Sequence, residues 1–293
     1  YRTYSRLTEQ GRESYQQVTD RTVKAIEELG RFTEQETALV REMQENRQVL
    51  PSGRWLWTGG TEWLQKQKNF SGAYNCTSTR VTDWQSLALM MDLAMMGSGT
   101  GAVIEDRHIE NLPVIRNRIK LKDVGDVGGS APDHRREHTY VEVRGNTVTI
   151  DCGDSRTGWV EAYEAFLDLS TDNYFDHTRP VCVYVDLNRV RPAGQKLNGF
   201  GGTSNPVKLP GIFPKMADIL NNAYGRKLTS TEICLLIDEA AAVVVAGNIR
   251  RSAGMRQFGS NDHEAARAKD NLWQQGEDGS WRIDPKRDAL RMA

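Results

Sequence analysis

Only four cysteines occur among the 293 residues, and no two of them form a CxxC pair. This spacing excludes a disulfide framework and a thiolate zinc site, and it favours a reducing, cytoplasmic setting. The five histidines show no HxH or HExxH spacing. We therefore expect no metal site.

Long apolar runs and an excess of one charge are missing too. The longest mostly apolar runs, residues 87–96 and 240–247, are too short to span a bilayer. Residues 1–13 are polar and charged, which is not typical of a signal segment. With 38 basic and 39 acidic residues the net charge is -1. Neither a membrane partner nor direct nucleic-acid binding is expected, and any phosphate site must be local.

The N-terminal part has the periodicity of helices. Residues 14–30 place apolar side chains on one face, and a glycine ends the pattern. A second helix is predicted from Thr33 to about Asn46, because Thr33 and Glu36 have the spacing of a capping box.

The pattern then changes to alternating strands and helices. Residues 73–81 predict a strand, and Asp83 would cap a helix that is apolar nearly all round. The glycine turn and strand of residues 98–105 complete a βαβ unit, so the fold class is α/β. Residues 106–140 are charged and are expected to end in a loop, and a hairpin is predicted around Gly145-Asn146. A helix capped by Asp154 or Ser155 and a buried strand near 181–190 follow. The rest of the pattern predicts helices at about 207–224 and 229–246, a loop and strand after 247, and a polar tail.

Glycines cluster at three junctions between these elements, in residues 96–102, 198–206 and 246–254. Such loops can cradle phosphate groups with backbone N–H donors, or they can simply form tight turns. No Walker A motif occurs, and GSGTGA follows a helix and precedes a strand, the reverse of a dinucleotide fingerprint. Arg250 and Arg251 suit a polyphosphate, although a solvated face or a salt bridge to Asp238 or Glu239 would explain them equally well.

The cysteines are not equivalent. Cys152, Cys182 and Cys234 lie in apolar patterns and are interpreted as small core side chains. Cys76 has small polar neighbours at a strand that leads into a buried helix. The spacing alone leaves both a reactive thiol and a structural side chain open at this position.

Six segments in order resemble consecutive parts of the catalytic subunit of ribonucleotide reductases. The resemblance is greatest to the adenosylcobalamin-dependent, monomeric ribonucleoside-triphosphate reductases, and it covers nearly the whole chain. No single segment is decisive, but the occurrence of all six in the same order makes the match specific. They are YSRLTEQGRESYQQVTDRTV, LPSGRWLWTGGTE, NCTSTRVTDWQSLALMMDLAMMGSGTGAVIE, VTIDCGDSRTGWVEA, VDLNRVRPAGQKLNGFGGTSNP and VVVAGNIRRSA.

The resemblance implies a ten-stranded α/β barrel, made of two antiparallel halves of parallel strands around a finger loop. Residues 1–50 would form a helical N-terminal region, and residues 51–293 the first part of the barrel. An insert at about residues 106–150 resembles the segment that replaces a dimer partner in the monomeric enzymes.

The family removes the ribose 2′-hydroxyl by thiyl-radical chemistry, with adenosylcobalamin as the radical source. A cysteine pair supplies the electrons and becomes a disulfide. The resemblance implies that Cys76 is the first member of this redox pair. The substrate-binding residues that it implies are Asn75, Gly97, Ser98, Gly99 and Gly101.

The resemblance also implies a dNTP effector site that controls specificity. Asp83 matches a carboxylate that binds the effector deoxyribose, and the glycine loops at about 191–206 and 247–253 match elements that couple effector and substrate. The effector-binding residues expected on this basis are Asp83, Arg191, Gly199, Phe200, Gly201, Gly202, Arg250 and Arg251.

Parts of the family pattern do not occur in these 293 residues. No NPCGE-type finger loop, second redox cysteine or C-terminal cysteine pair is found, and no residue is assigned to the cobalamin site. We therefore expect an oxidoreductase fragment that is inactive alone. Its partners would be a ribonucleotide, a dNTP, a thioredoxin-like or dithiol reductant and a C-terminal fragment of the same enzyme. A diphosphate reductase of the same superfamily and a non-catalytic dNTP-binding fragment are the alternatives.

Overall fold

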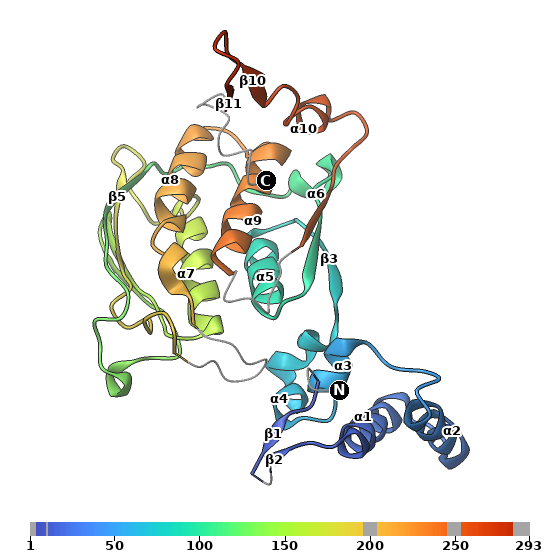
Figure 1. Ribbon diagram of the computed structural model, residues 1–293. Coiled ribbons are helices and arrows are strands. Elements are labelled where there is room, and N and C mark those ends of the chain that lie inside the picture. The colour runs from blue at the N-terminus through green and yellow to red at the C-terminus, as the bar shows by residue number, and fades with distance from the viewer. Residues whose placement is uncertain (1–3, 10, 196–203, 245–252, 284–293) are drawn as a thin grey trace. The chain divides into compact units, whose positions relative to one another are not determined.

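The computed structural model describes residues 4–9, 11–195, 204–244 and 253–283 (Figure 1). These residues form two compact units, and the chain passes from the first to the second between Asn75 and Cys76. The sequence suggests a domain boundary earlier, at residue 50. The assignment of the following residues to a reductase barrel with an insert remains a prediction.

The first unit is mainly helical. Ser14 and Thr33 form complete capping boxes at the starts of α1 (Tyr15–Gly30) and α2 (Glu34–Glu45), which confirms both predicted helices. Arg31 ends α1 in the left-handed conformation, with φ of 52°. The short elements are β1 (Leu7–Thr8), β2 (Gly11–Arg12), α3 (Gly53–Thr58), α4 (Glu62–Gln65) and the 3-10 helix η1 (Gln67–Ala73).

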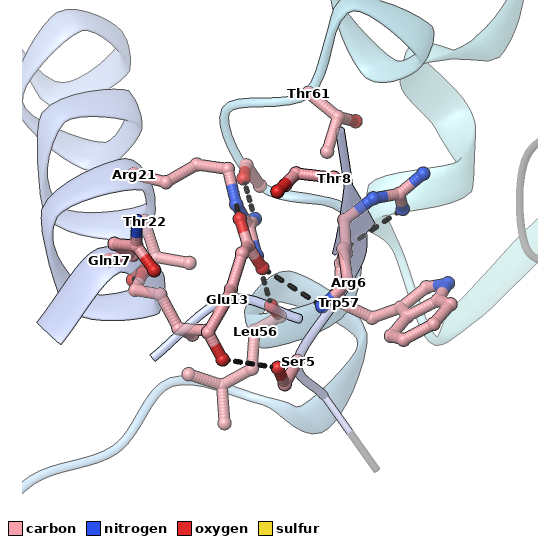
Figure 2. A network of polar contacts seen from close by, with 12 residues as sticks. Ser5, Arg6, Thr8, Glu13, Gln17, Arg21, Thr22, Leu56, Trp57 and Thr61 are labelled. Carbon is pink, nitrogen blue, oxygen red and sulfur yellow. Dashed lines mark hydrogen bonds and ion pairs between the residues drawn. The ribbon is translucent and has the colours of Figure 1, made fainter. Parts of the chain in front are cut away.

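A buried carboxylate joins three segments of this unit (Figure 2). The Glu13 oxygens accept hydrogen bonds from Arg21 Nε at 2.8 Å and Arg21 Nη2 at 3.0 Å. The backbone N–H of Arg6 also donates to Glu13, at 3.0 Å. Both arginines also bind backbone carbonyls of α3. Arg6 Nη1 donates to the Trp57 carbonyl and Arg21 Nη2 donates to the Leu56 carbonyl, each at 3.1 Å.

The first sheet of the second unit contains the predicted βαβ unit. Its strands β3 (Cys76–Arg80), β4 (Gly99–Val103) and β9 (Gly254–Gln257) are parallel and lie in this order. Helix α5 (Trp84–Met95) connects β3 to β4 and is capped by Asp83, as expected. Most of its apolar side chains are buried, although Leu89 is exposed, which explains why the sequence shows almost no polar face.

The second sheet has the order β5-β8-β7-β6. Strand β8 (Val181–Asp186) lies between the parallel strands β5 (Ile119–Val124) and β7 (Thr147–Asp151). Strand β6 (Tyr140–Arg144) pairs with β7 as the predicted hairpin. Strand β5 was not predicted, because it is an edge strand with alternating charged residues and an irregular register.

Three more helices complete the core. Figure 1 shows α7 (Arg156–Leu169) and α8 (Ile212–Asn222) against the second sheet, while α9 (Ser230–Val244) packs on α5 and α8. Ser155, and not Asp154, caps α7. The tail holds an unpredicted hairpin of β10 (Trp273–Gln275) and β11 (Trp281–Ile283). The remaining short elements are α6 (Asp106–Ile109), η2 (Pro132–His134), η3 (Pro206–Lys208) and α10 (His263–Ala266).

We predict that Glu13→Gln lowers the free energy of unfolding by about 3 kcal/mol near neutral pH, because Arg21 then stays buried without a counter-charge. Burial alone would raise the pKa of Glu13, but hydrogen bonds from Arg21 and Arg6 and their charges lower it. The stabilisation is therefore complete above the pKa of the unfolded chain, and it is lost as the pH falls through the lower pKa of the folded state.

Urea unfolding of both proteins at neutral and acidic pH measures this difference. The gap between wild type and Glu13→Gln should shrink in acid, and an equal gap at both pH values would contradict the prediction. Asp20→Asn is the control, because it removes an exposed ion pair with Arg41. Its effect should stay below about 1 kcal/mol.

Candidate active site

Cys76 is exposed, and it is the first residue of β3. In the parallel register, Cys76 lies beside Gly99 of β4 and Ser78 lies beside Gly101. Alternate residues of a strand face the same side, so Cys76, Ser78 and Arg80 share one face, and all three are exposed. The structure therefore brings the predicted thiol next to Gly99, and it places Gly101 two residues further along the same strand pair.

The glycines leave bare backbone beside the thiol. A Cβ at Gly101 would lie 3.0 Å from the Thr77 carbonyl oxygen and 3.5 Å from Met255 Cε. Met255 pairs with Gly101 from β9 and is itself 57% exposed. A ligand at this face would thus contact the Cys76 thiol, glycine backbone and a flexible thioether side chain.

Gly97 and Ser98 have a structural role in the turn between α5 and β4. Gly97 has a φ of 77°, which favours glycine. Its N–H donates to the Ala94 carbonyl at 2.7 Å, and the Ser98 N–H donates to the Leu93 carbonyl at 3.0 Å. Both donors close the end of α5, so in this conformation they are not free to bind phosphate, and Ser98 is fully buried.

Asn75 directly precedes Cys76 in the chain and belongs to the first unit. It is exposed, and its Oδ1 accepts a hydrogen bond from Arg54 Nε at 2.8 Å. Arg54 Nη1 also donates to the Gly72 carbonyl, at 3.2 Å. Sequence reasoning did not find Arg54, because nothing in the RWLW stretch indicates a contact 21 residues away.

Asp83 uses both carboxylate oxygens at the start of α5. Oδ1 accepts from the Ser86 N–H at 2.7 Å and from the Ser86 hydroxyl at 2.6 Å, and Oδ2 accepts from the Thr82 hydroxyl at 3.1 Å. The hydrogen bonds from Ser86 lower the pKa of Asp83. On α7, partial burial together with the charges of Asp83 and Glu161 raises the pKa of Glu164. Asp83 remains exposed, with acidic neighbours.

Arg191 is already engaged by Asp154. Its Nε donates to both Asp154 oxygens, at 2.9 and 3.0 Å, and its backbone N–H donates to Oδ1 at 2.9 Å. Arg189 Nε likewise donates to both carboxylate oxygens of Asp151 at the end of β7, at 3.1 and 2.9 Å. These contacts fix the start of the glycine loop to the end of the sheet. Gly199, Phe200, Gly201, Gly202, Arg250 and Arg251 lie outside the described residues.

The two carboxylates considered as partners for Arg250 and Arg251 have other partners. Asp238 pairs with Arg256 of β9, and Glu239 accepts from Lys215 Nζ at 2.7 Å.

The other cysteines differ from Cys76 in their surroundings. Burial raises the pKa of Cys152 to about 12 and that of Cys234 to about 11. Cys182 is half-buried on β8. The raised pKa values of Cys152 and Cys234 suit the core role predicted for these two residues.

Two kinds of feature are absent from the described part of the chain. In the four described ranges, no group of three or more His, Cys, Asp or Glu side chains could hold a metal ion. The helices of the same ranges include none that is both long and apolar enough to cross a membrane.

Comparisons with known proteins agree with one another. The family model of the B12-dependent ribonucleotide reductase insertion domain matches residues 133–220, which begins inside the predicted insert and extends past it. The adenosylcobalamin-dependent ribonucleoside-triphosphate reductases of Lactobacillus helveticus and Lactobacillus gasseri are 29% and 28% identical, with 74% of this chain aligned to 32% and 33% of theirs. A putative enzyme of this kind from Mycobacterium phage D29 is 29% identical, with 87% of this chain aligned to 38% of its length.

A solved structure shows the same fold. The crystal structure of a B12-dependent (class II) ribonucleotide reductase superposes with a TM-score of 0.71 at 21% identity, over 92% of this chain and 42% of the other. The chain therefore has the fold of this part of a class II ribonucleotide reductase. Within that class, the sequence is similar to the B12-dependent ribonucleoside-triphosphate reductases over an N-terminal portion of their length. It spans about a third of the length of these curated relatives.

We predict that Asp83→Ala lowers the free energy of unfolding by about 1 kcal/mol, because the first turn of α5 loses its side-chain acceptor. Asp83→Asn keeps an acceptor and should change stability by only a few tenths of a kcal/mol. Chemical denaturation of the three proteins measures the difference. Equal stability of Asp83→Ala and wild type would show that burial of α5 alone fixes its start.

Proposed function

We propose that the chain is the N-terminal portion of a cytoplasmic enzyme that reduces ribonucleoside triphosphates to 2′-deoxyribonucleoside triphosphates. The observation that carries the proposal is the place of Cys76, exposed at the start of β3 beside Gly99 of β4. The relatives named above are triphosphate reductases, which supports this substrate over a diphosphate.

In this proposal Cys76 supplies one of two thiols. The two thiols together give up two electrons and two protons and become a disulfide. The ribose C2′–OH bond breaks, and its oxygen leaves as water with one of the protons. The two electrons and the other proton form the new C2′–H bond. Cys152, Cys182 and Cys234 are buried or half-buried, so the second thiol would come from another part of the enzyme. A thioredoxin-like or small dithiol would then reduce the disulfide by thiol exchange.

Adenosylcobalamin, bound to the complete enzyme, would supply the radical that activates the ribose. None of the described residues is assigned to its binding. This chain would instead present the thiol and hold the ribose at the open face of β3, β4 and β9. Met255 would cover the ribose over Gly101 and limit its contact with water.

A dNTP effector would bind near the start of α5. Asp83 is exposed there and could accept a hydrogen bond from the deoxyribose hydroxyl, in addition to those from Ser86. Because Asp83, Glu161 and Glu164 are acidic, the effector phosphates would need cations from elsewhere, and Arg250 and Arg251 are the proposed source. Arg191 would act by fixing the loop, through Asp154.

We predict that Cys76→Ser in the complete enzyme abolishes multiple turnover with a dithiol reductant, because a serine hydroxyl cannot form the disulfide. Binding of dNTP, measured by equilibrium dialysis, should not change. Cys182→Ser is the matched control, a half-buried cysteine that should leave turnover intact. Turnover by Cys76→Ser would refute the redox role. A wild-type chain that binds no dNTP would refute the effector site.

A further inference from the structure

Arg54 contacts two points of the segment that leads to Cys76. From α3, its Nε donates to Asn75 Oδ1 at 2.8 Å and its Nη1 donates to the Gly72 carbonyl at 3.2 Å. Gly72 is buried near the end of η1, whereas Asn75 is exposed. One guanidinium thus holds both the backbone and the side chain that come just before the thiol.

The contact decides which way the Asn75 amide faces. An asparagine side chain can present an oxygen acceptor or an NH₂ donor, but an arginine can only donate. Oδ1 must therefore face Arg54, which directs Nδ2 away from it. Within the residues that the structure describes, Asn75 Nδ2 has no hydrogen-bond partner. It is an oriented donor on an exposed side chain, and such a donor suits a hydroxyl oxygen.

We propose that Arg54 is a positioning residue of the active site. It holds Asn75 so that Nδ2 donates a hydrogen bond to a hydroxyl oxygen of the substrate ribose. Arg54 itself does not touch the substrate. The inference rests on the proposed function, since it takes the ribose to lie beside Cys76.

A double-mutant cycle in the complete enzyme tests this role. Arg54→Gln and Asn75→Ala should each lower kcat/KM for the ribonucleotide by about tenfold to a hundredfold, the usual cost of a misplaced contact. Because Arg54 acts through Asn75, the double variant should be no worse than Asn75→Ala alone. If the fold-losses in kcat/KM of the two single variants multiply in the double variant, the proposal is overturned.

Three further variants separate positioning from folding. Asn75→Asp keeps an acceptor for Arg54 but removes the donor, so it should lose activity like Asn75→Ala and keep its stability. Arg54→Lys can bind one of the two acceptors and should recover part of the activity. Arg41→Gln, at an exposed ion pair of the same unit, should change neither activity nor stability.

The outcomes also separate this inference from the proposed function. Full turnover in both Cys76→Ser and Asn75→Ala would refute the proposed function. Full turnover in Arg54→Gln, with Asn75→Ala impaired, would leave the function standing and refute the role of Arg54. A loss in Arg54→Gln that appears with reduced stability, and that Arg54→Lys does not relieve, would also overturn it.

Discussion

The burial of α5 is the constraint on which the second unit depends. Eight of its twelve residues are buried, and apolar side chains on nearly every side cannot remain in water. The helix is therefore covered by β3 and β4 on one side and by α7 and α9 on others. Covering it this way makes β3 and β4 parallel neighbours, and their register places Cys76 beside Gly99.

Strand β3 also separates the two proposed sites. It runs from Cys76 to Arg80, which is about 13 Å at the usual rise per residue. The proposed redox thiol stands at its start, and the proposed effector carboxylate, Asp83, follows its end. Since Asp83 also caps α5, a ligand that changes its hydrogen bonds acts on the helix that holds β3 in place. The two sites thus share one packed element, and packed elements deform little.

The sequence predicts those parts of the fold that local patterns determine. Helices α1 and α2, the βαβ unit and the β6–β7 hairpin follow from capping residues and from periodicity, which are properties of neighbouring residues. The hairpins β1–β2 and β10–β11 were missed, because strands of two or three residues are too short to show a period. Strand β5 was not predicted because its own apolar content is low. It is a strand because it pairs with β8.

The candidate site also has a part that the sequence predicts and a part that it does not. Cys76 and its glycines were expected from a resemblance, and their register then places them together. The contact from Arg54 to Asn75 joins residues 21 apart, and the one from Arg191 to Asp154 joins residues 37 apart, so neither shows in a local pattern.

Both contacts use the same property of arginine. Its guanidinium presents several donors in a rigid fork, so it can hold two acceptors of a neighbouring segment in fixed positions. Arg191 was expected to bind an anionic ligand, yet its Nε and backbone N–H are satisfied by Asp154. Asp154 stands in the segment DCGDSRTGW, just before the cap of α7. An arginine near a glycine loop can therefore hold the loop to a carboxylate of the fold, and the effector-binding role of Arg191 stays a prediction.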